Sequence, residues 1–366
     1  MKKAVVFGGC GEIGKWVVRD LLEYSDFAPI VIGDIREERA KAFIKELNTT
    51  RVTFQKVDAH DQQSLISALE GATIAINTIG PFFEFALLVA NAVYQAGVNY
   101  VDVCDDPDAT VNLLSLDEMV KRKGLTFLIC QGWTPGVTNM MAKKGAMQMD
   151  KVRSLRVVWV QDLEEEIGIA PIMHWGHVVV GKIPTYRDRK WVLVPGLSER
   201  EEVRLPDPIG VVAVYHAGHP EPVTLPRYID AELVSCKGGL VPHSAVTLTR
   251  VVRATGIGNT TEGLRFVAKT FIPLLPLISK VGGKTSGWSG SRVEILGEKD
   301  GKLKSLVYGV KMRVGETTGR SASIGAQMVA SGEITEKGVM PPEGCVDPDR
   351  FFAEFTKRGL TLIEMD

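Results

Sequence analysis

The chain has 366 residues, enough for about two domains that each bury their own core. Its 43 basic and 44 acidic residues nearly cancel, which argues against nucleic acid or an anionic membrane as partner and favours small-molecule chemistry. Five cysteines without a C-x-x-C pair predict neither a disulfide framework nor a cysteine-rich zinc site. Since no apolar leader precedes the first strand-like run, we expect a cytoplasmic protein.

The first part of the chain alternates strand-like and helix-like segments. Apolar runs typical of buried strands occur at 3–9, 29–34, 52–58, 73–80, 99–105 and 125–132. Segments with apolar residues at helical spacing lie between them, at 14–25, 38–47, 61–71, 83–97 and 111–124. Apolar strands joined by helices predict a parallel sheet covered on both faces. We therefore expect a doubly wound α/β domain of the Rossmann type over residues 1–130.

The pattern changes after Gly132. We predict a helix at 136–149, a strand at 152–160, helices at 245–256 and 261–271, and a hairpin at 291–314 with its turn at Asp300-Gly301. The proline-rich stretch between them favours strands and loops, and 172–180 also has a strand-like character. We expect an α+β substrate-binding and dimerisation domain over residues 131–320. Helices in residues 321–366 should pack back on the Rossmann domain.

Two phosphate-binding motifs overlap in GGCGEIGKW, residues 8–16. Gly9 to Lys15 match the start of a nucleoside-triphosphate loop, but that loop needs Ser or Thr after its lysine as a magnesium ligand, and Trp16 stands there. Gly9, Gly11 and Gly14 form G-x-G-x-x-G between a predicted strand and a predicted helix, which favours a dinucleotide site. We expect the tight turn at Gly9, close approach of the pyrophosphate at Gly11, and helix packing at Gly14.

An acidic residue ends the second predicted strand. Asp34 follows Gly14 by twenty positions, where a carboxylate binds the ribose hydroxyls of NAD. Arg36 could instead pair with the 2′-phosphate of NADP, so we expect NAD as the cofactor, with NADP as the alternative. The expected cofactor-binding set in these first loops is Gly9, Gly11, Glu12, Ile13, Gly14, Asp34, Arg36, Asp58 and Ala59.

Four further segments carry a family resemblance: N-T-I-G-P-F at 77–82, Y-V-D at 100–102, G-x-x-P-G-x-x-N at 132–139 and GVMPPEGCVDPDRFF at 338–352. Together they resemble the saccharopine dehydrogenase family, which includes saccharopine reductases, lysine 6-dehydrogenases and carboxynorspermidine dehydrogenase-like enzymes. The resemblance implies a nicotinamide-dependent enzyme that acts on a carbon–nitrogen bond of an amino acid or amine through an imine. Saccharopine reductases carry Asp where this chain has Thr134, which argues against saccharopine itself as the substrate.

The resemblance also implies residue roles. The G-P-F loop, here Gly80, Pro81 and Phe82, would lie beside the nicotinamide, and Pro135 and Gly136 near the substrate. Independently, ligands of open α/β sheets bind beyond the carboxyl ends of strands, which adds Thr78 to the cofactor set. A helix that starts at Gly136 would direct backbone N–H groups at a substrate carboxylate, although plain capping also explains its polar residues. The expected substrate-binding residues are Cys104, Thr134, Pro135, Gly136, Asn139 and Arg227.

Hydride transfer at a C–N bond needs one group that moves a proton. The candidates are Asp105, just past a predicted strand, and His219 and Glu221 in the proline-rich segment GHPEPVTLPR. A surface turn and a solvated loop histidine are the structural alternatives. His174 and His177 have H-x-x-H spacing, but a strand there would place them on opposite faces, so no metal site is expected.

Three functions remain open at this level. The first is an NAD(P)-dependent dehydrogenase or reductase acting on CH–NH or CH–NH2 groups. The second is an enzyme that recycles NAD while it rearranges a C–N bond, like homospermidine synthase relatives, and the third is a non-catalytic nucleotide-binding sensor. The expected partner is a small amino-acid or amine substrate, and the resemblance together with the apolar, strand-rich second domain favours a homodimer.

Overall fold

The computed structural model describes residues 2–165, 168–274 and 285–365. It divides into two compact units, which we call unit 1 (Met1–Val137 and Gly315–Arg358) and unit 2 (Thr138–Val314 and Gly359–Asp366). The sequence patterns suggested boundaries after residues 130 and 320. In the structure the chain leaves unit 1 after Val137, returns to it at Gly315, and ends in unit 2.

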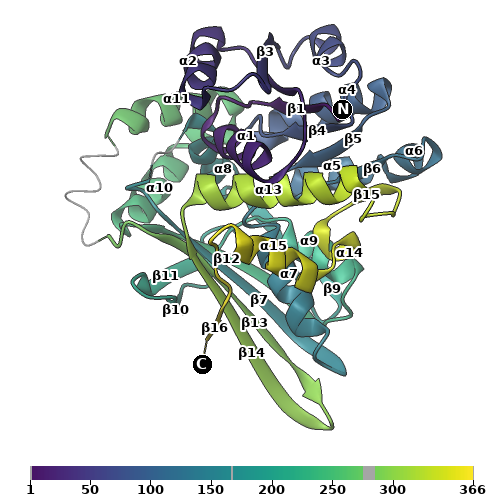
Figure 1. Ribbon diagram of the computed structural model, residues 1–366. Helices are drawn as coiled ribbons and strands as arrows, with labels where there is room; N and C mark the ends of the chain where they lie inside the picture. Colours follow the sequence, from purple (N-terminus) through teal and green to yellow (C-terminus); the bar gives the residue numbers. More distant parts are fainter. Residues whose placement is uncertain (1, 166–167, 275–284, 366) are drawn as a thin grey trace. The chain divides into compact units, whose positions relative to one another are not determined.

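Unit 1 is built on a parallel sheet of strand order β15-β6-β5-β4-β1-β2-β3 (Figure 1). Its strands are β1 (Ala4–Phe7), β2 (Ile30–Asp34), β3 (Val52–Lys56), β4 (Ile74–Asn77), β5 (Asn99–Asp102), β6 (Thr126–Leu128) and β15 (Gly338–Met340). Every residue of β1, β2 and β4 is buried, as a sheet covered on both faces requires. The predicted Rossmann-type sheet is confirmed, and β15 extends it by a strand that the sequence analysis did not predict.

The helices of unit 1 cover this sheet. They are α1 (Glu12–Tyr24), α2 (Glu37–Leu47), α3 (Gln62–Ala68), α4 (Phe82–Ala96), α5 (Pro107–Leu114), α6 (Asp117–Arg122), α13 (Val314–Ser331), α14 (Pro342–Cys345) and α15 (Pro348–Lys357). Helix α13 lies along α1, and the approach is close because a Cβ at Gly319 would come within 2.6 Å of the Trp16 Cβ (Figure 1). Small residues on α13 therefore let the late part of the chain pack on the first helix.

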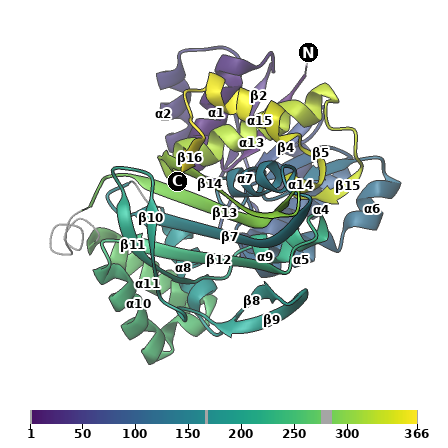
Figure 2. The same ribbon diagram turned by 90° about the horizontal axis from the view of Figure 1, so that it is seen from below.

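Unit 2 is built on a mixed sheet of order β10-β11-β12-β7-β13-β14-β16, and β8 pairs with both β12 and β9 (Figure 2). The strands are β7 (Lys151–Asp162), β8 (Lys182–Arg187), β9 (Lys190–Pro195), β10 (Glu201–Leu205), β11 (Gly210–His216), β12 (Leu233–Val241), β13 (Ser289–Lys299), β14 (Lys302–Met312) and β16 (Ile363–Met365). Strands β7 and β12 run parallel, whereas β13 and β14 form the predicted hairpin with Asp300 and Gly301 at its turn. A second α+β unit is thereby confirmed.

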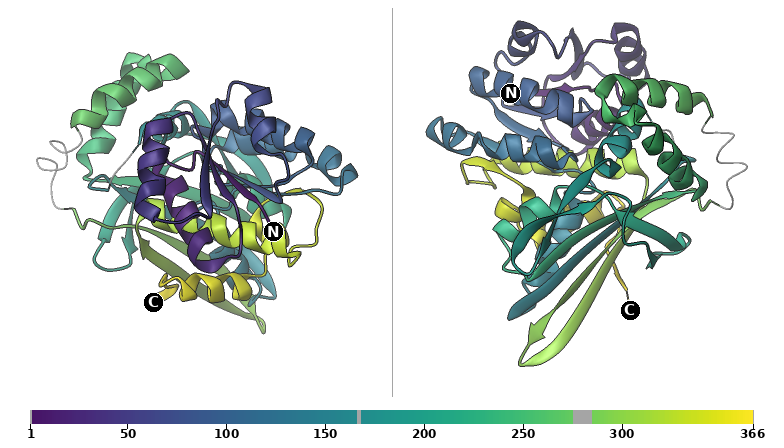
Figure 3. Two further views of the ribbon diagram at one scale, coloured as in Figure 1. Left: turned by 45° about the horizontal axis from the view of Figure 1, so that its top comes forward. Right: turned by 180° about the vertical axis from the view of Figure 1, so that it is seen from behind.

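The helices of unit 2 are α7 (Val137–Ala146), α8 (Ile169–Val179), α9 (Glu221–Thr224), α10 (Ser244–Thr255) and α11 (Thr261–Phe271), with short 3-10 turns at Leu225–Arg227, Ile257–Asn259 and Ile272–Leu274 (Figures 2 and 3). The strand expected at 172–180 is wrong, because these residues belong mainly to α8. Its run of apolar residues also places Trp175, Val178 and Val179 on one buried face, which is helical spacing. Within the described ranges, no helix is long and apolar enough to cross a membrane.

A buried carboxylate holds the loops that follow β5 and β6. Asp102 is fully buried, and one of its oxygens, Oδ1, accepts backbone N–H bonds from Cys104 at 3.0 Å and Cys130 at 2.7 Å. Burial raises the pKa of Asp102 to about 6, although these two N–H groups act in the opposite direction. The carboxyl group thus fixes two loops at the carboxyl edge of the sheet.

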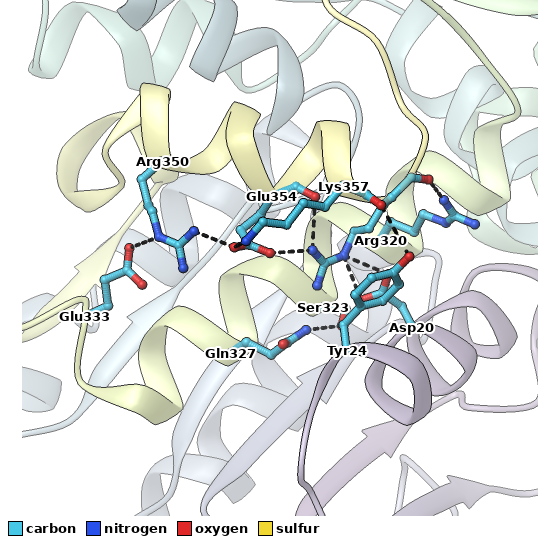
Figure 4. A network of polar contacts seen from close by, with 10 residues as sticks. Asp20, Tyr24, Arg320, Ser323, Gln327, Glu333, Arg350, Glu354 and Lys357 are labelled. Carbon is cyan, nitrogen blue, oxygen red and sulfur yellow. Dashed lines mark hydrogen bonds and ion pairs between the residues drawn. The ribbon is translucent and has the colours of Figure 1, made fainter.

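A second buried charge joins α1, α13 and α15 within unit 1 (Figure 4). The Arg358 guanidinium donates to both oxygens of Asp20, at 3.1 and 2.9 Å, and both side chains are 1% exposed. Arg358 also donates to Glu354 Oε2 at 2.8 Å and stacks over the Tyr24 ring at 4.3 Å. Burial raises the pKa of Asp20 even though Arg358 lowers it, so the carboxylate depends on this cation.

Replacing Arg358 with Met should therefore lower the free energy of unfolding by about 3–5 kcal/mol, because it leaves the buried Asp20 carboxylate without its cation. Urea unfolding of the full-length chain measures this loss. Arg350→Met on the same helix is the matched control, since Arg350 is 45% exposed and its pair with Glu333 should contribute less than about 1 kcal/mol. Equal losses in the two variants would contradict a role for burial.

Asp102 gives a pH-dependent expectation. Because the pKa is raised from 3.8 to about 6, the folded state binds a proton more tightly than the unfolded state. The stabilising contribution is complete below pH 4 and is lost as the pH rises through 6, by about 3 kcal/mol. Asp102→Asn keeps the acceptor oxygen but cannot ionise, so its stability relative to the native chain should rise from pH 4 to 7. Urea unfolding across this range should show a larger rise than Asp61→Asn, at an exposed helix cap.

Candidate functional site

The glycine-rich loop between β1 and α1 is shaped by backbone contacts. Gly8 has φ +75°, the left-handed conformation of the tight turn, and its N–H donates to Gly33 O at 2.8 Å. A Cβ at Gly14 would lie 2.2 Å from Gly8 O, so only glycine lets α1 start this close to β1. At Gly11 a Cβ would meet Gly8 O at 3.0 Å and Arg36 Nη2 at 3.6 Å. The turn residue is thus Gly8, where the sequence analysis expected Gly9.

The carboxylate at the end of β2 is held by its own loop. Asp34 is 4% exposed and accepts hydrogen bonds from Arg36 N at 3.0 Å, Nε at 3.1 Å and Nη2 at 3.2 Å. Burial opposes its ionisation, but the bonds from Arg36 outweigh burial and lower the pKa of Asp34. Burial and the adjacent Asp34 raise the pKa of the Cys10 thiol to about 12. Asp34 is therefore an ionised acceptor at the strand end, and Arg36 is half-exposed beside it.

Loops that follow β3 and β4 also reach this edge of the sheet. Asp58 and Ala59 follow β3, and Asp58 Oδ1 accepts the His60 N–H at 2.9 Å. Thr78 donates its hydroxyl to Phe7 O at 2.8 Å, which ties the end of β4 to β1. Gly80, Pro81 and Phe82 lead directly into α4, whose Phe83 N–H donates to Asp106 Oδ2 at 2.9 Å. The other predicted loop residues, Glu12 and Ile13, begin α1, and Glu12 pairs with Arg39.

The loop after β5 contains Cys104 and Asp105. Cys104 is fully buried, and its sulfur lies 3.5 Å from the Thr110 hydroxyl, which in turn lies 3.4 Å from Cys130 Sγ. Burial raises the pKa of the Cys104 thiol well above its usual value, so this side chain is neutral and unsuited to nucleophilic attack. Asp105 is partly exposed, whereas its neighbours Cys104 and Asp106 are both buried.

The turn at 132–136 brings the chain to the start of α7. Gly136 has φ +125°, and a Cβ there would lie 2.1 Å from Gly132 O, so the turn requires glycine. Gly132 N–H donates to Pro135 O at 3.0 Å, and Val137 N–H donates to Gly132 O at 3.1 Å. Thr134 is 9% exposed. The predicted Pro-Gly opening of a helix is therefore present as a tight, buried turn.

In unit 2, the first turn of α7 is joined to α9 by side chains. Thr138 donates its hydroxyl to Glu221 Oε1 at 2.9 Å, and Asn139 Nδ2 donates to Thr224 Oγ1 at 3.3 Å. All four residues are fully buried. Arg227, also expected to bind substrate, is exposed on the next turn and donates from Nε to Val223 O at 3.2 Å. The structure thus brings Asn139 and Glu221 into one network and leaves Arg227 at the surface of unit 2.

Two histidines extend this network. His219 Nδ1 lies 3.1 Å from Glu221 Oε2, and His219 Nε2 lies 3.3 Å from His174 Nε2. Because the carboxylate accepts only, Nδ1 of His219 carries a proton, and in neutral His219 Nε2 then accepts one from His174. The Trp159 ring packs on His219 at 5.0 Å and edge-on to Trp175 at 5.8 Å. The result is a buried carboxylate–imidazole–imidazole chain that can pass a proton along its length.

The same atoms offer a metal donor set. Ligand atoms of His219, Glu221 and Cys236 all lie within 4.8 Å of one another, and His, Glu and Cys are ligands that zinc accepts. Burial, followed by the Glu221 carboxylate, raises the pKa of Cys236 well above its usual value, and a metal would have to displace that thiol proton. Since Nδ1 of His219 cannot both donate to Glu221 and bind a metal, a proton chain and a metal site are alternative uses of this cluster.

The sequence analysis did not predict several residues of the proton chain and of the loop after β5. His174 was missed because its segment was interpreted as a strand. Thr138 was not among the candidates, since only Thr134 and Asn139 were considered among the polar residues of this segment. Asp106, not Asp105, binds the α4 backbone, although both follow the same strand. The signal that could have identified His174 is the helical spacing of Trp175, Val178 and Val179, which fixes the face on which the adjacent histidine lies.

Comparisons with known proteins agree with this geometry. Residues 5–128 match the family model described as the saccharopine dehydrogenase NADP-binding domain. This range contains the glycine-rich loop and the loops after β2, β3 and β4, and it ends within β6. The match confirms the predicted resemblance and NAD(P) as the cofactor.

Solved structures extend the likeness to the fold of the chain. Saccharopine dehydrogenase (L-Glu forming) from Saccharomyces cerevisiae has a TM-score of 0.69 at 14% identity, with 100% of this chain and 99% of that chain covered. Pen from Bacillus thuringiensis has a TM-score of 0.32 at 16% identity and covers 35% of this chain and 49% of its own. A short-chain dehydrogenase/reductase from Veillonella parvula has a TM-score of 0.25 at 17% identity over 28% and 46%. The chain therefore carries a nucleotide-binding domain of the saccharopine dehydrogenase family, within a fold like that of the yeast enzyme.

Proposed function

We propose that this protein is an NAD(P)-dependent oxidoreductase that transfers a hydride at a carbon–nitrogen bond of an amino acid or amine. The family match over residues 5–128 supports the nucleotide, and the whole-chain likeness to yeast saccharopine dehydrogenase supports the class of substrate. The observation that carries the proposal is the buried chain of His174, His219 and Glu221, because this reaction must move a proton as well as a hydride.

The residues of unit 1 would bind and orient the nucleotide. Free backbone N–H groups at the start of α1 suit the pyrophosphate, and Gly11 leaves room for it. The ionised Asp34 would accept hydrogen bonds from the ribose, while Arg36 would be free to turn toward a 2′-phosphate. The remaining cofactor contacts would come from Asp58, Ala59 and the loop from Thr78 to Phe82. The nicotinamide, when bound, accepts or supplies the hydride.

The residues of unit 2 would move the proton. Oxidation of an amine to an imine removes a hydride from carbon and a proton from nitrogen. The His174–His219–Glu221 chain can take up that proton, because protonation of His174 at Nδ1 lets its Nε2 hydrogen pass to Nε2 of His219. His219 keeps its Nδ1 hydrogen, so the positive charge then lies beside the Glu221 carboxylate. Thr138 holds the other oxygen of Glu221 and so fixes the orientation of the carboxylate. In reductive amination the same steps run in reverse.

Asp105 would be the second proton-moving candidate, because it is a partly exposed carboxylate past the end of β5. Cys104, Thr134, Pro135, Gly136, Asn139 and Arg227 would contribute to substrate binding. The substitution of Thr134 for the aspartate of saccharopine reductases favours a smaller amino acid or a diamine over saccharopine. We also propose that the functional form is a homodimer.

The experiment that tests the function combines binding with turnover. Thermal shifts of the full-length protein are measured with NAD and NADP, each alone and with lysine, saccharopine, diamines and 2-oxoacids; a ligand at a hundredfold its dissociation constant adds about 2.7 kcal/mol. Absorbance of reduced nicotinamide then follows turnover. Net formation or loss of the reduced cofactor is expected. Turnover of an amine with no net change would instead favour a recycling enzyme, and binding without turnover a sensor.

Gly11→Val should abolish nucleotide binding while leaving the unliganded protein folded. The backbone at this position is extended, with φ −75° and ψ 174°, which valine adopts, but its side chain would occupy the space of the pyrophosphate. Thermal shift measures both effects at once. The unliganded protein should still unfold in one transition, at a melting temperature lowered by the tight contact of the new Cβ with Gly8 O, and the shift with NAD or NADP should disappear. A retained shift would overturn the assignment of the glycine loop.

His219→Gln and Glu221→Gln should each lower kcat by about 10²–10⁴ without weakening nucleotide binding, because each interrupts the proton chain. His216→Gln is the matched control: His216 is 1% exposed, but it contacts Glu199 at 3.0 Å and lies outside the chain. Steady-state kinetics across pH also separate proton transfer from a structural effect, since loss of the chain should remove one limb of the profile. Equal losses in His216→Gln would contradict the proposed role.

A further inference from the structure

A cavity in unit 2 is lined almost entirely by apolar side chains. It is partly open to solvent, has a volume of about 100 Å³ and lies between α8, α10 and α11. The residues that line it include Ile172, Trp175, Val179, Leu248, Leu264 and Phe271. Figure 3 shows α10 and α11 running close together in this part of unit 2. Polar groups of its wall form hydrogen bonds with one another. Trp175 Nε1 donates to Thr249 Oγ1, and the Thr249 hydroxyl donates to Ala245 O, each at 2.8 Å. The walls therefore offer little to a water molecule.

One cation stands at the edge of this cavity. Arg253 of α10 lines it and also lines an open hollow formed with Gly196, Leu197 and Arg250. Arg253 Nη1 donates to Gly196 O at 2.7 Å, and Arg250 lies over the Tyr215 ring at 4.8 Å. Within the described part of the chain, neither guanidinium is paired with a carboxylate. The two arginines are three residues apart on one helix, so they present positive charge on the same side.

We infer that this cavity is a binding site for a free aliphatic carboxylate, whose chain fills the apolar space and whose carboxylate pairs with Arg253. An apolar space that water does not fill gains most from a hydrocarbon ligand, and an unpaired guanidinium at its edge selects an anionic head group. The inference does not depend on the proposed redox reaction, because its residues are neither in the proton chain nor in unit 1.

The volume sets the length of the chain. Since a dry apolar cavity of about 150 Å³ holds one benzene molecule, a cavity of about 100 Å³ holds roughly four carbon atoms. Each methylene that enters should raise the affinity roughly fourfold, until the cavity is full. Straight-chain carboxylates of about five to seven carbons should therefore saturate the site, and longer chains should gain little.

Isothermal titration of the full-length protein with butanoate, hexanoate, octanoate, decanoate and dodecanoate tests the site. Affinity should rise with chain length and level off at about six carbons. Decylamine should bind at least tenfold more weakly than decanoate, because its charge opposes Arg253. Arg253→Met should remove this preference while decanol binding persists. Constant affinity across the series, or equal binding of the amine, would overturn the proposal.

Substitutions that fill the cavity test whether the ligand binds inside it. Val252→Trp, on α10, and Val267→Phe, on α11, both fill the space, and each should reduce decanoate binding at least tenfold. Val251→Trp is the matched control, since Val251 is its neighbour on the same helix, is 59% exposed and does not line the cavity. Melting temperatures show whether each variant folds. Unchanged decanoate binding in both filling variants would refute the site, as would binding to anionic vesicles without binding to monomeric decanoate.

Discussion

The close contact of α1 with the glycine loop is the constraint on which unit 1 depends. With no room for a Cβ at Gly14, α1 begins directly over the turn, and its first N–H groups face the carboxyl edge of the sheet. The same helix presents Trp16 to Gly319 of α13 and Asp20 to Arg358 beyond α15. One helix therefore both shapes the nucleotide loop and receives the last helices of the chain.

Trp159 has a comparable role in unit 2. It lies on β7 between two aromatic neighbours, His219 and Trp175, so a single side chain supports the proton chain on one side and an aliphatic cavity on the other. Helix α8 joins the same two places, because adjacent positions 174 and 175 contribute to the chain and to the cavity wall. Buried hydrogen bonds fix the imidazoles, whereas most of the cavity wall is apolar side chains held by packing. The hydrogen bonds of the proton chain and those of the cavity wall, which come from Trp175, Thr249 and Arg253, involve different residues.

The sequence alone was sufficient to predict those structural features that depend on neighbouring residues in the chain. A fully buried strand and the polar residue after it form a continuous pattern in the sequence. This pattern placed Asp34 and Thr78 at the edge of a parallel sheet. Long-range pairing is different: β15 is three residues long and joins β6 across more than two hundred positions, so no window of sequence contains both. His174 and His219 are 45 residues apart, and a run rich in valine obscured the helix that brings them together.

The discontinuity of unit 1 has a consequence for the order in which the protein is made. Residues 1–137 leave the ribosome well before Gly315–Arg358, which complete the same unit. Until then β6 is an open sheet edge that awaits β15, and Asp20 has no cation beside it. Because domains tend to fold as their chain emerges, the nascent nucleotide-binding domain must survive with an unprotected edge while Thr138–Val314 of unit 2 are synthesised. Its completion waits for Gly315–Arg358, and a ribosome that stalls before these residues releases a sheet able to pair with the wrong strand.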